Sequence, residues 1–282
     1  MTDKPGTAAG YSARQAARVR QTCLYLATRL GDFIDDLVVV GGMVPSLLID
    51  QDDLPRGASA HAGTMDLDLG LAVALFEGAR YRGLTERLRQ SGFEPDRNAR
   101  GRRVRQRWRS ETKEAVTVDF LIQPASPKER GGGIRNIEED FAAVIAPGLH
   151  LAFADRRRVG VAGNTPFGER AARDIWVCGP GAYVVLKSLA FRMRGTGKDA
   201  YDLYYVVRNY GSGVEDVADS LNGLMNDPAA RRALQYLRED FLGIDSPGPM
   251  RTASFMTGGA DPDIQADVAG FTGRLLTACA TC

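Results

Sequence analysis

The chain has few residues that could cross-link or anchor a protein. Four cysteines in 282 residues are too few and too scattered for a disulfide framework, so we expect reduced thiols. Cys279 and Cys282 have C-x-x-C spacing, but without a second pair or a nearby histidine we assign them no function. There is no run of 18 apolar residues and no charged-then-apolar leader, which predicts a cytoplasmic protein without a membrane partner.

Charge of either sign is also not in excess. The 36 basic and 35 acidic residues leave a formal net charge of +1, which gives no whole-molecule argument for nucleic-acid or membrane binding. Any such binding must come from local clusters.

Only two histidines occur, and neither lies in a nucleophile-elbow glycine pattern, which argues against a serine or cysteine hydrolase. We expect His61 to be a surface-loop residue.

The first part of the chain has the patterns of a mixed α/β domain. Apolar residues at helical spacing predict helices, and alternating or β-branched runs predict strands. The expected elements are a helix over 12–30, strands over 37–40 and 65–69, helices over 43–49 and 75–91, and antiparallel strands over 102–109 and 115–122.

The pattern changes near residue 175. Residues 124–148 are rich in proline and glycine and predict a loop with at most a short helix over 137–144, followed by strands over 149–153 and 158–162. After residue 180, helical spacing dominates. The predicted helices are 182–193, 200–208, 214–225 and 228–241, so we expect an α/β domain over 1–175 and a helical domain over 176–282.

Three aspartates form a candidate metal site. Asp66 and Asp68 are two apart on a predicted strand and share one face, and two such close carboxylates repel unless a cation lies between them. Asp119 lies in an apolar strand, where a charged residue should be paired or bind metal. Oxygen ligands of this kind suit Mg²⁺ or Mn²⁺. The alternative is a solvated strand face.

A glycine pair follows the strand over 37–40. Gly41 and Gly42 would bring backbone N–H groups and a helix N-terminus close to a polyphosphate. Ser46 lies one turn inside the predicted helix, where its hydroxyl could touch a phosphate, cap the helix or face solvent.

Charged residues interrupt an apolar helix in the second part. Lys187 lies in an otherwise apolar stretch and needs an anionic partner, and Arg192 follows five residues later. Asp199 and Asp202 are three apart on one helix face, so either could pair with Lys187 or act as a base. The alternative is an ion-pair cluster between the two domains.

Seven arginines and no acidic residue occur from 97 to 109. Four of them share one face of the predicted strand and could follow an RNA backbone: Arg103, Arg105, Arg107 and Arg109. The alternative is a charged edge strand that blocks aggregation.

These residues, in this order, resemble the nucleotidyltransferase superfamily, and more closely its AbiEii-like and MenT toxins of type IV toxin-antitoxin systems. The resemblance spans about residues 37–210 and rests on five segments, which are Gly41-Gly42-x-x-x-Ser46, Thr64-Met65-Asp66-Leu67-Asp68-Leu69, the Asp119 strand, Lys187-x-x-x-x-Arg192 and Lys198-Asp199-x-x-Asp202-Leu203. It implies a polymerase-beta-like mixed sheet followed by a helical domain that contributes Lys187 and Asp202 to the active-site cleft.

The resemblance further implies a bacterial toxin that transfers NMP from an NTP to an RNA, the tRNA 3′ end, and thereby blocks translation and growth. It assigns the Mg²⁺ on the triphosphate to Asp66 and Asp68, charge neutralisation to Lys187, and a catalytic role to Asp202 with support from Asp199. Thr64 would lie near the nucleotide, and a cognate antitoxin would be a partner. Two alternatives remain, a small-molecule or protein hydroxyl as acceptor, and a catalytically silent nucleotide-binding module.

Overall fold

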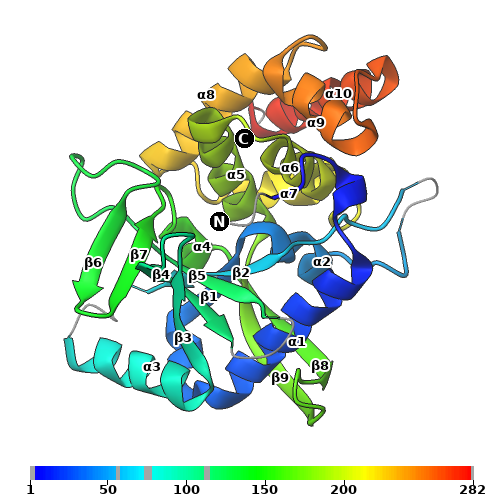
Figure 1. The fold of residues 1–282 in the computed structure, drawn as a ribbon. Helices are drawn as coiled ribbons and strands as arrows, with labels where there is room; N and C mark the ends of the chain where they lie inside the picture. Colours follow the sequence, from blue (N-terminus) through cyan, green and yellow to red (C-terminus); the bar gives the residue numbers. More distant parts are fainter. Residues whose placement is uncertain (1–3, 55–57, 73–77, 111–114, 281–282) are drawn as a thin grey trace. The chain divides into compact units, whose positions relative to one another are not determined.

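The computed structural model describes residues 4–54, 58–72, 78–110 and 115–280, and about half of the chain is helical (Figure 1). It is a mixed α/β structure that divides into two compact units. The first unit contains Ala13–Met43 and Gly63–Val177, and the second contains Lys4–Ser12, Val44–Ala62 and the chain from Cys178 onward. The chain passes from the first unit to the second after Val177, two residues beyond the domain boundary predicted at residue 175. A contiguous first domain over 1–175 is nevertheless not formed, because residues 4–12 and 44–62 belong to the second unit.

The first unit is built on a mixed sheet. Within the described residues, nine strands join in the order β3-β4-β5-β2-β1-β9-β8, and the β6–β7 hairpin joins through β7 on β5. The inner strands β2 and β5 run parallel, while β1 and β4 pair antiparallel with them. The strands are β1 Leu37–Val40, β2 Asp66–Leu71, β3 Phe93–Arg97, β4 Arg103–Ser110, β5 Thr117–Ile122, β6 Ile134–Glu138, β7 Phe141–Ile145, β8 Arg156–Asn164 and β9 Arg170–Cys178.

Helices of different lengths accompany this sheet. In the first unit, α1 packs against β2 and β8, α3 against β3 and β6, and α4 against β1. Their bounds are α1 Ala13–Arg29, α3 Gly78–Gln90, α4 Leu151–Ala154 and the 3-10 helix η2 Gly31–Asp36. The N-terminal part of the helix predicted over 75–91 lies outside the described residues.

Some sequence predictions for this unit are wrong. The predicted helix over 137–144 is instead the β6–β7 hairpin, and the predicted strand over 149–153 is largely α4. The apolar run Phe141–Ile145 carries no periodicity that separates helix from strand, and its pairing with β5 decides for strand. The predictions also missed β3 and β9, whose charged residues interrupt any apolar pattern.

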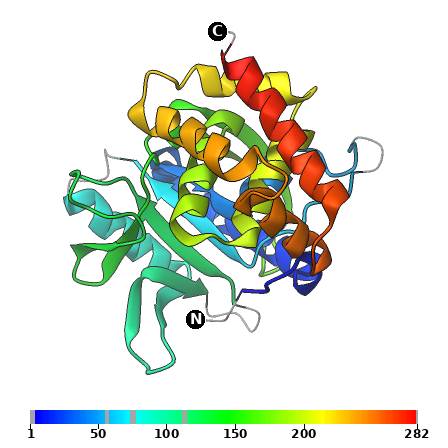
Figure 2. The same cartoon turned by 90° about the horizontal axis from the view of Figure 1, so that it is seen from above.

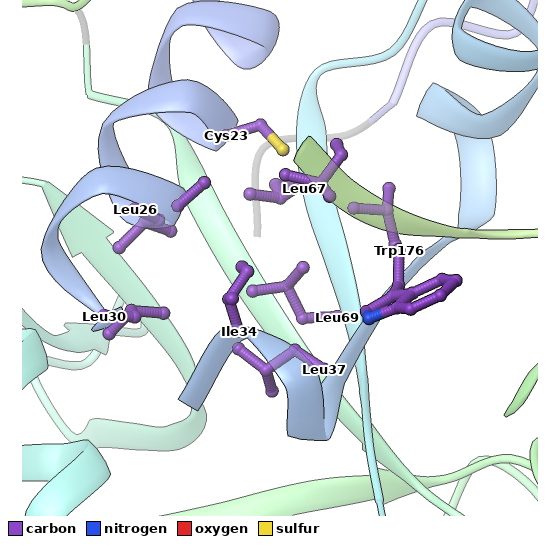
Figure 3. A pocket seen from close by; sticks show the side chains of 11 residues that line it. Cys23, Leu26, Leu30, Ile34, Leu37, Leu67, Leu69 and Trp176 are labelled. Carbon is purple, nitrogen blue, oxygen red and sulfur yellow. The ribbon is translucent and has the colours of Figure 1, made fainter. Parts of the chain in front are cut away.

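The alternation in β2 separates an apolar face from an acidic one. Leu67 and Leu69 are buried, at 0% and 3% exposure, and line a small apolar pocket opposite Cys23 and Leu26 of α1 (Figure 3). Burial raises the pKa of the Cys23 thiol to about 12, so this cysteine is not a reactive thiolate. Because α1 covers the leucine face, the aspartates of β2 project from the other face.

The second unit is a group of helices. Helix α5 packs against α6, α7 and α8, while α10 packs against α7 and α9 and is drawn in red in Figure 2. Two helix ends have recognisable caps. The side chain of Asp227 accepts a hydrogen bond from the N–H of Ala229 at the start of α8, and Gly195 ends α5 with φ +63°. The helices are α2 Val44–Leu48, α5 Pro180–Arg194, α6 Gly197–Asn209, α7 Val214–Asn222, α8 Pro228–Phe241, α9 Pro247–Thr257 and α10 Pro262–Ala280, with 3-10 helix η1 Ala8–Gly10.

The sequence patterns predicted α5 to α8 within a few residues but missed α9 and α10, each of which begins at a proline. Among the described residues, none of the helices has both the length and the apolar character needed to cross a bilayer.

Replacing Leu67 by alanine should destabilise the chain by about 2–5 kcal/mol, because it opens a cavity under the strand that carries the acidic residues. Leu242→Ala is the control, since that side chain is 48% exposed and its loss should cost well under about 1 kcal/mol. Urea denaturation of both variants measures the difference, and equal midpoints would contradict the assignment of Leu67 to the core.

Candidate functional site

Three aspartates of the first unit come together as an acidic triad, Asp66, Asp68 and Asp119. Each offers a carboxylate oxygen, and these atoms all lie within 4.8 Å of one another. The parallel register of β2 and β5 pairs Asp68 directly with Asp119, which puts them on the same face. Asp66 is buried at 3% exposure, and the other two are partly exposed. This oxygen-only donor set can hold a hard divalent cation.

The buried end of the triad is held by Thr64. Its hydroxyl lies 3.2 Å from both the carbonyl oxygen and Oδ1 of Asp66, and Thr64 itself is 7% exposed. A hydrogen bond from the hydroxyl to this carboxylate fixes the orientation of the Asp66 side chain. The structure thus shows Thr64 in contact with the first aspartate, and its place near a nucleotide stays a prediction.

The glycine pair lies against the triad. Gly41 and Gly42 begin the 3-10 turn η3, Gly41–Met43, directly after β1. Gly41 has φ +69°, a left-handed conformation, and a Cβ at this position would lie 1.9 Å from Oδ2 of Asp68. Glycine is therefore required both by the backbone and by the close approach of the carboxylate.

A guanidinium completes this site. Arg107 of β4 lies opposite Asp119 in the antiparallel β4–β5 register and donates from Nε to Oδ1 at 2.6 Å and from Nη2 to Oδ2 at 2.5 Å. Nη2 is also 3.9 Å from Oδ2 of Asp66. The hydrogen bonds to Asp119 raise the pKa of Arg107 further above its ordinary value, so it is a permanent cation.

The predicted row of RNA-binding arginines is thus not uniform. Arg103 pairs with Asp140, Arg105 donates to the carbonyl of Glu139, and Arg107 belongs to the acidic site. Arg109 is exposed. The four arginines therefore differ in their contacts, with Arg107 bound to Asp119, and RNA binding by this row stays a prediction. Alternation along the strand predicts which arginines share a face, but it does not predict which acidic residues of neighbouring strands lie beside them.

The second unit holds a buried ion-pair cluster around Lys187. Its Nζ donates to Asp199 Oδ1 at 2.9 Å and to Asp202 Oδ2 at 2.7 Å. Burial alone would lower the pKa of Lys187, but the charges of Asp202 and Asp199 outweigh it and hold that pKa above its usual value. Both aspartates are at most 1% exposed. The cluster therefore contains a lysine and two carboxylates that are all ionised.

Further cations and a histidine surround the two carboxylates. Arg194 binds Asp199 through two hydrogen bonds of 2.6 and 2.8 Å, and Lys198 pairs with Asp202. Burial would raise the pKa of each aspartate, but Lys187 and its neighbouring cations lower both pKa values below the ordinary range. A buried network of this kind tolerates the loss of a partner poorly.

His61 is a buried member of this cluster rather than a surface-loop residue, which corrects the sequence prediction. Its Nε2 is 2.8 Å from Oδ1 of Asp202, and its ring stacks on Tyr201 with centroids 5.3 Å apart. Burial lowers the pKa of His61 to about 4, so the ring is neutral near pH 7 and donates one hydrogen bond. Local sequence patterns cannot predict this contact, because 141 residues separate His61 from Asp202.

Arg192 and Ser46, two further residues of the segments on which the resemblance rests, also belong to the second unit. Arg192 pairs with Glu239 and Asp240 of α8 and stacks over Tyr236 at 4.4 Å, so its guanidinium is engaged away from Lys187. Five residues along α5 separate the two, which turns them to different faces of the helix. Ser46 lies in α2 and is partly exposed.

No protein-family model matches the chain, and the search of curated proteins gives no significant match. The chemistry of the two residue groups must therefore carry the functional argument.

Gly41→Ala should lose about 1–2 kcal/mol of stability and also weaken divalent-cation binding, because the new methyl group displaces Asp68. Gly92→Ala is the matched control, since Gly92 has φ +75° and nothing lies within 4 Å of its added Cβ. Both variants should shift the unfolding midpoint. Only Gly41→Ala should shift Mn²⁺ affinity in calorimetry, and an equal effect of the two would refute the steric argument.

Lys187→Met should destabilise the chain by about 3–5 kcal/mol, because it leaves two buried carboxylates without their shared cation. Arg192→Met on the same helix removes a cation whose side chain is 36% exposed, and it should cost about 1 kcal/mol or less. Chemical denaturation compares the two, and similar losses would show that the Lys187 cluster is solvated.

Proposed function

We propose that this protein is a divalent-metal-dependent nucleotidyltransferase that transfers a nucleoside monophosphate from an NTP to an RNA acceptor, the tRNA 3′ end. The observation that carries the proposal is the acidic triad on β2 and β5, next to the glycine turn after β1. Phosphoryl-type transfer needs mainly positioning and charge neutralisation, and carboxylates that hold a metal on a triphosphate supply the latter.

The residues of the triad fit Mg²⁺ or Mn²⁺. They supply oxygen ligands only, and the backbone at Gly41 leaves room for Asp68 that any larger residue would fill. When bound, the ion would neutralise triphosphate charge and favour attack by an acceptor hydroxyl. Asp66 and Asp68 would be its main ligands and Asp119 a third, while Thr64 fixes the orientation of Asp66.

The proposal also includes Lys187 and Asp202 of the second unit. The charged neighbours of each group keep the lysine cationic and the aspartate ionised. The resemblance assigns them charge neutralisation and a catalytic role, and the proposal retains both. Asp199, with Arg194, would keep the lysine in place.

Exposed arginines of β3, β4 and their connection support an RNA acceptor. Guanidinium groups bind phosphates through paired N–H donors and follow a nucleic-acid backbone without reading sequence. The exposed members of this group are Arg97, Arg100, Arg102, Arg103 and Arg109. An RNA-modifying toxin that blocks translation, controlled by an antitoxin, is the biological form of this activity that we propose.

The test is incorporation of label from each α-³²P-NTP into total tRNA with Mg²⁺ or Mn²⁺, resolved on a denaturing gel. Wild-type protein should label tRNA with at least one NTP, and Asp68→Asn should reduce labelling by about 10²-fold or more, because it removes a ligand charge. Asp174→Asn is the matched control, since this exposed aspartate pairs with Arg158 and should leave labelling unchanged.

A variant with Arg97, Arg100 and Arg102 changed to glutamine extends this test to the acceptor. It should weaken tRNA labelling and flatten its salt dependence, because fewer phosphate contacts release fewer counterions. Labelling of a small molecule or protein instead of tRNA would favour the alternative acceptors. No transfer from any NTP by folded protein would contradict the proposal and favour a silent binding module.

A further inference from the structure

Arg107 and Asp119 face each other across the middle of the metal site. The registers of β4, β5 and β2 place Arg107, Asp119 and Asp68 side by side on one sheet face. Both oxygens of Asp119 accept hydrogen bonds from this one guanidinium, at 2.6 and 2.5 Å. The third carboxylate of the triad is therefore already bound by a cation that belongs to the chain.

A divalent cation at the triad would meet this fixed positive charge. The ligand oxygens lie within 4.8 Å of one another, and Nη2 of Arg107 is 3.9 Å from Oδ2 of Asp66. Like charges at such distances repel strongly when they are poorly solvated, and the Arg107 side chain is only 20% exposed. Metal and guanidinium thus compete for the same oxygens.

The neighbouring arginines do not share this role. Arg105 donates to a backbone carbonyl at Glu139, and Arg109 is exposed. Arg103 pairs with Asp140, which is 41% exposed and lies outside the triad. Among the described arginines of β4, Arg107 is the one that reaches a carboxylate of the triad.

We propose that Arg107 is a tethered cation that competes with the divalent metal for Asp119 and so weakens metal binding by the protein alone. The inference rests on the proposed metal site but not on the transfer reaction or its acceptor. Displaced from Asp119, the guanidinium keeps its charge and is a paired N–H donor of the kind that binds phosphate. The site would then hold metal firmly only once another anion occupies Arg107.

The experiment is a calorimetric titration of the full chain with Mn²⁺ in the absence of nucleotide. Arg107→Gln should bind Mn²⁺ about tenfold more tightly than wild type, or more, because the competing charge is gone. Arg109→Gln is the matched control, since it removes the same charge two residues along the strand and should leave the affinity unchanged. Arg107→Lys keeps the charge but not the paired hydrogen bonds, so its Mn²⁺ affinity should lie between those of wild type and Arg107→Gln.

Asp119→Asn defines where the competition occurs. In that background, Arg107→Gln should give a clearly smaller gain in Mn²⁺ affinity, because the contested carboxylate is absent. Thermal unfolding of each variant verifies the fold, and Arg107→Lys serves if Arg107→Gln does not fold.

Two results would overturn the inference, and they separate it from the proposed function. If wild type and Arg107→Gln bind Mn²⁺ equally while Asp68→Asn abolishes binding, the metal site stands and the competition is refuted. If no folded variant binds Mn²⁺, both the competition and the metal-dependent transferase fail.

Discussion

The strict alternation of β2 is the constraint on which the rest of the first unit depends. Leu67 and Leu69 must face α1, so Asp66 and Asp68 must face the other way. A register slip of one residue would turn both carboxylates toward an apolar pocket, where an unpaired charge is costly to bury. Hydrophobic burial on one face of the strand therefore keeps two repelling acids together on the other, which is the arrangement a cation stabilises.

Each unit contains a group of carboxylates that cations of the same unit contact, but the two groups differ in geometry. In the second unit the two buried aspartates meet Lys187, Lys198 and Arg194. In the first unit Arg107 binds Asp119, and oxygens of three aspartates converge within 4.8 Å of one another. A divalent cation needs several oxygen ligands that converge on one point, and this is why we place the metal in the first unit.

Local patterns predicted much of this arrangement. Period-two alternation showed the shared face of Asp66 and Asp68, and a lone charge in an apolar strand marked Asp119. The pairing of Arg107 with Asp119 depends on hairpin register, which alternation does not determine. The burial of His61 depends on a contact across 141 residues. The prediction of a helix was also wrong at Phe141–Ile145, because a short apolar run is compatible with a helix or a strand. Its pairing with β5 makes it a strand.

The segment Val44–Ala62 leaves the first unit after η3 and returns to it at Gly63, and on the way it gives His61 to the second unit. Its partner Asp202 lies 141 residues later in the chain. A ribosome that makes this protein from its N-terminus therefore releases the segment long before α5 and α6 exist. The second unit cannot close until most of the chain has been synthesised, and a fragment that stops at Val177 would carry two segments with nothing to fold against.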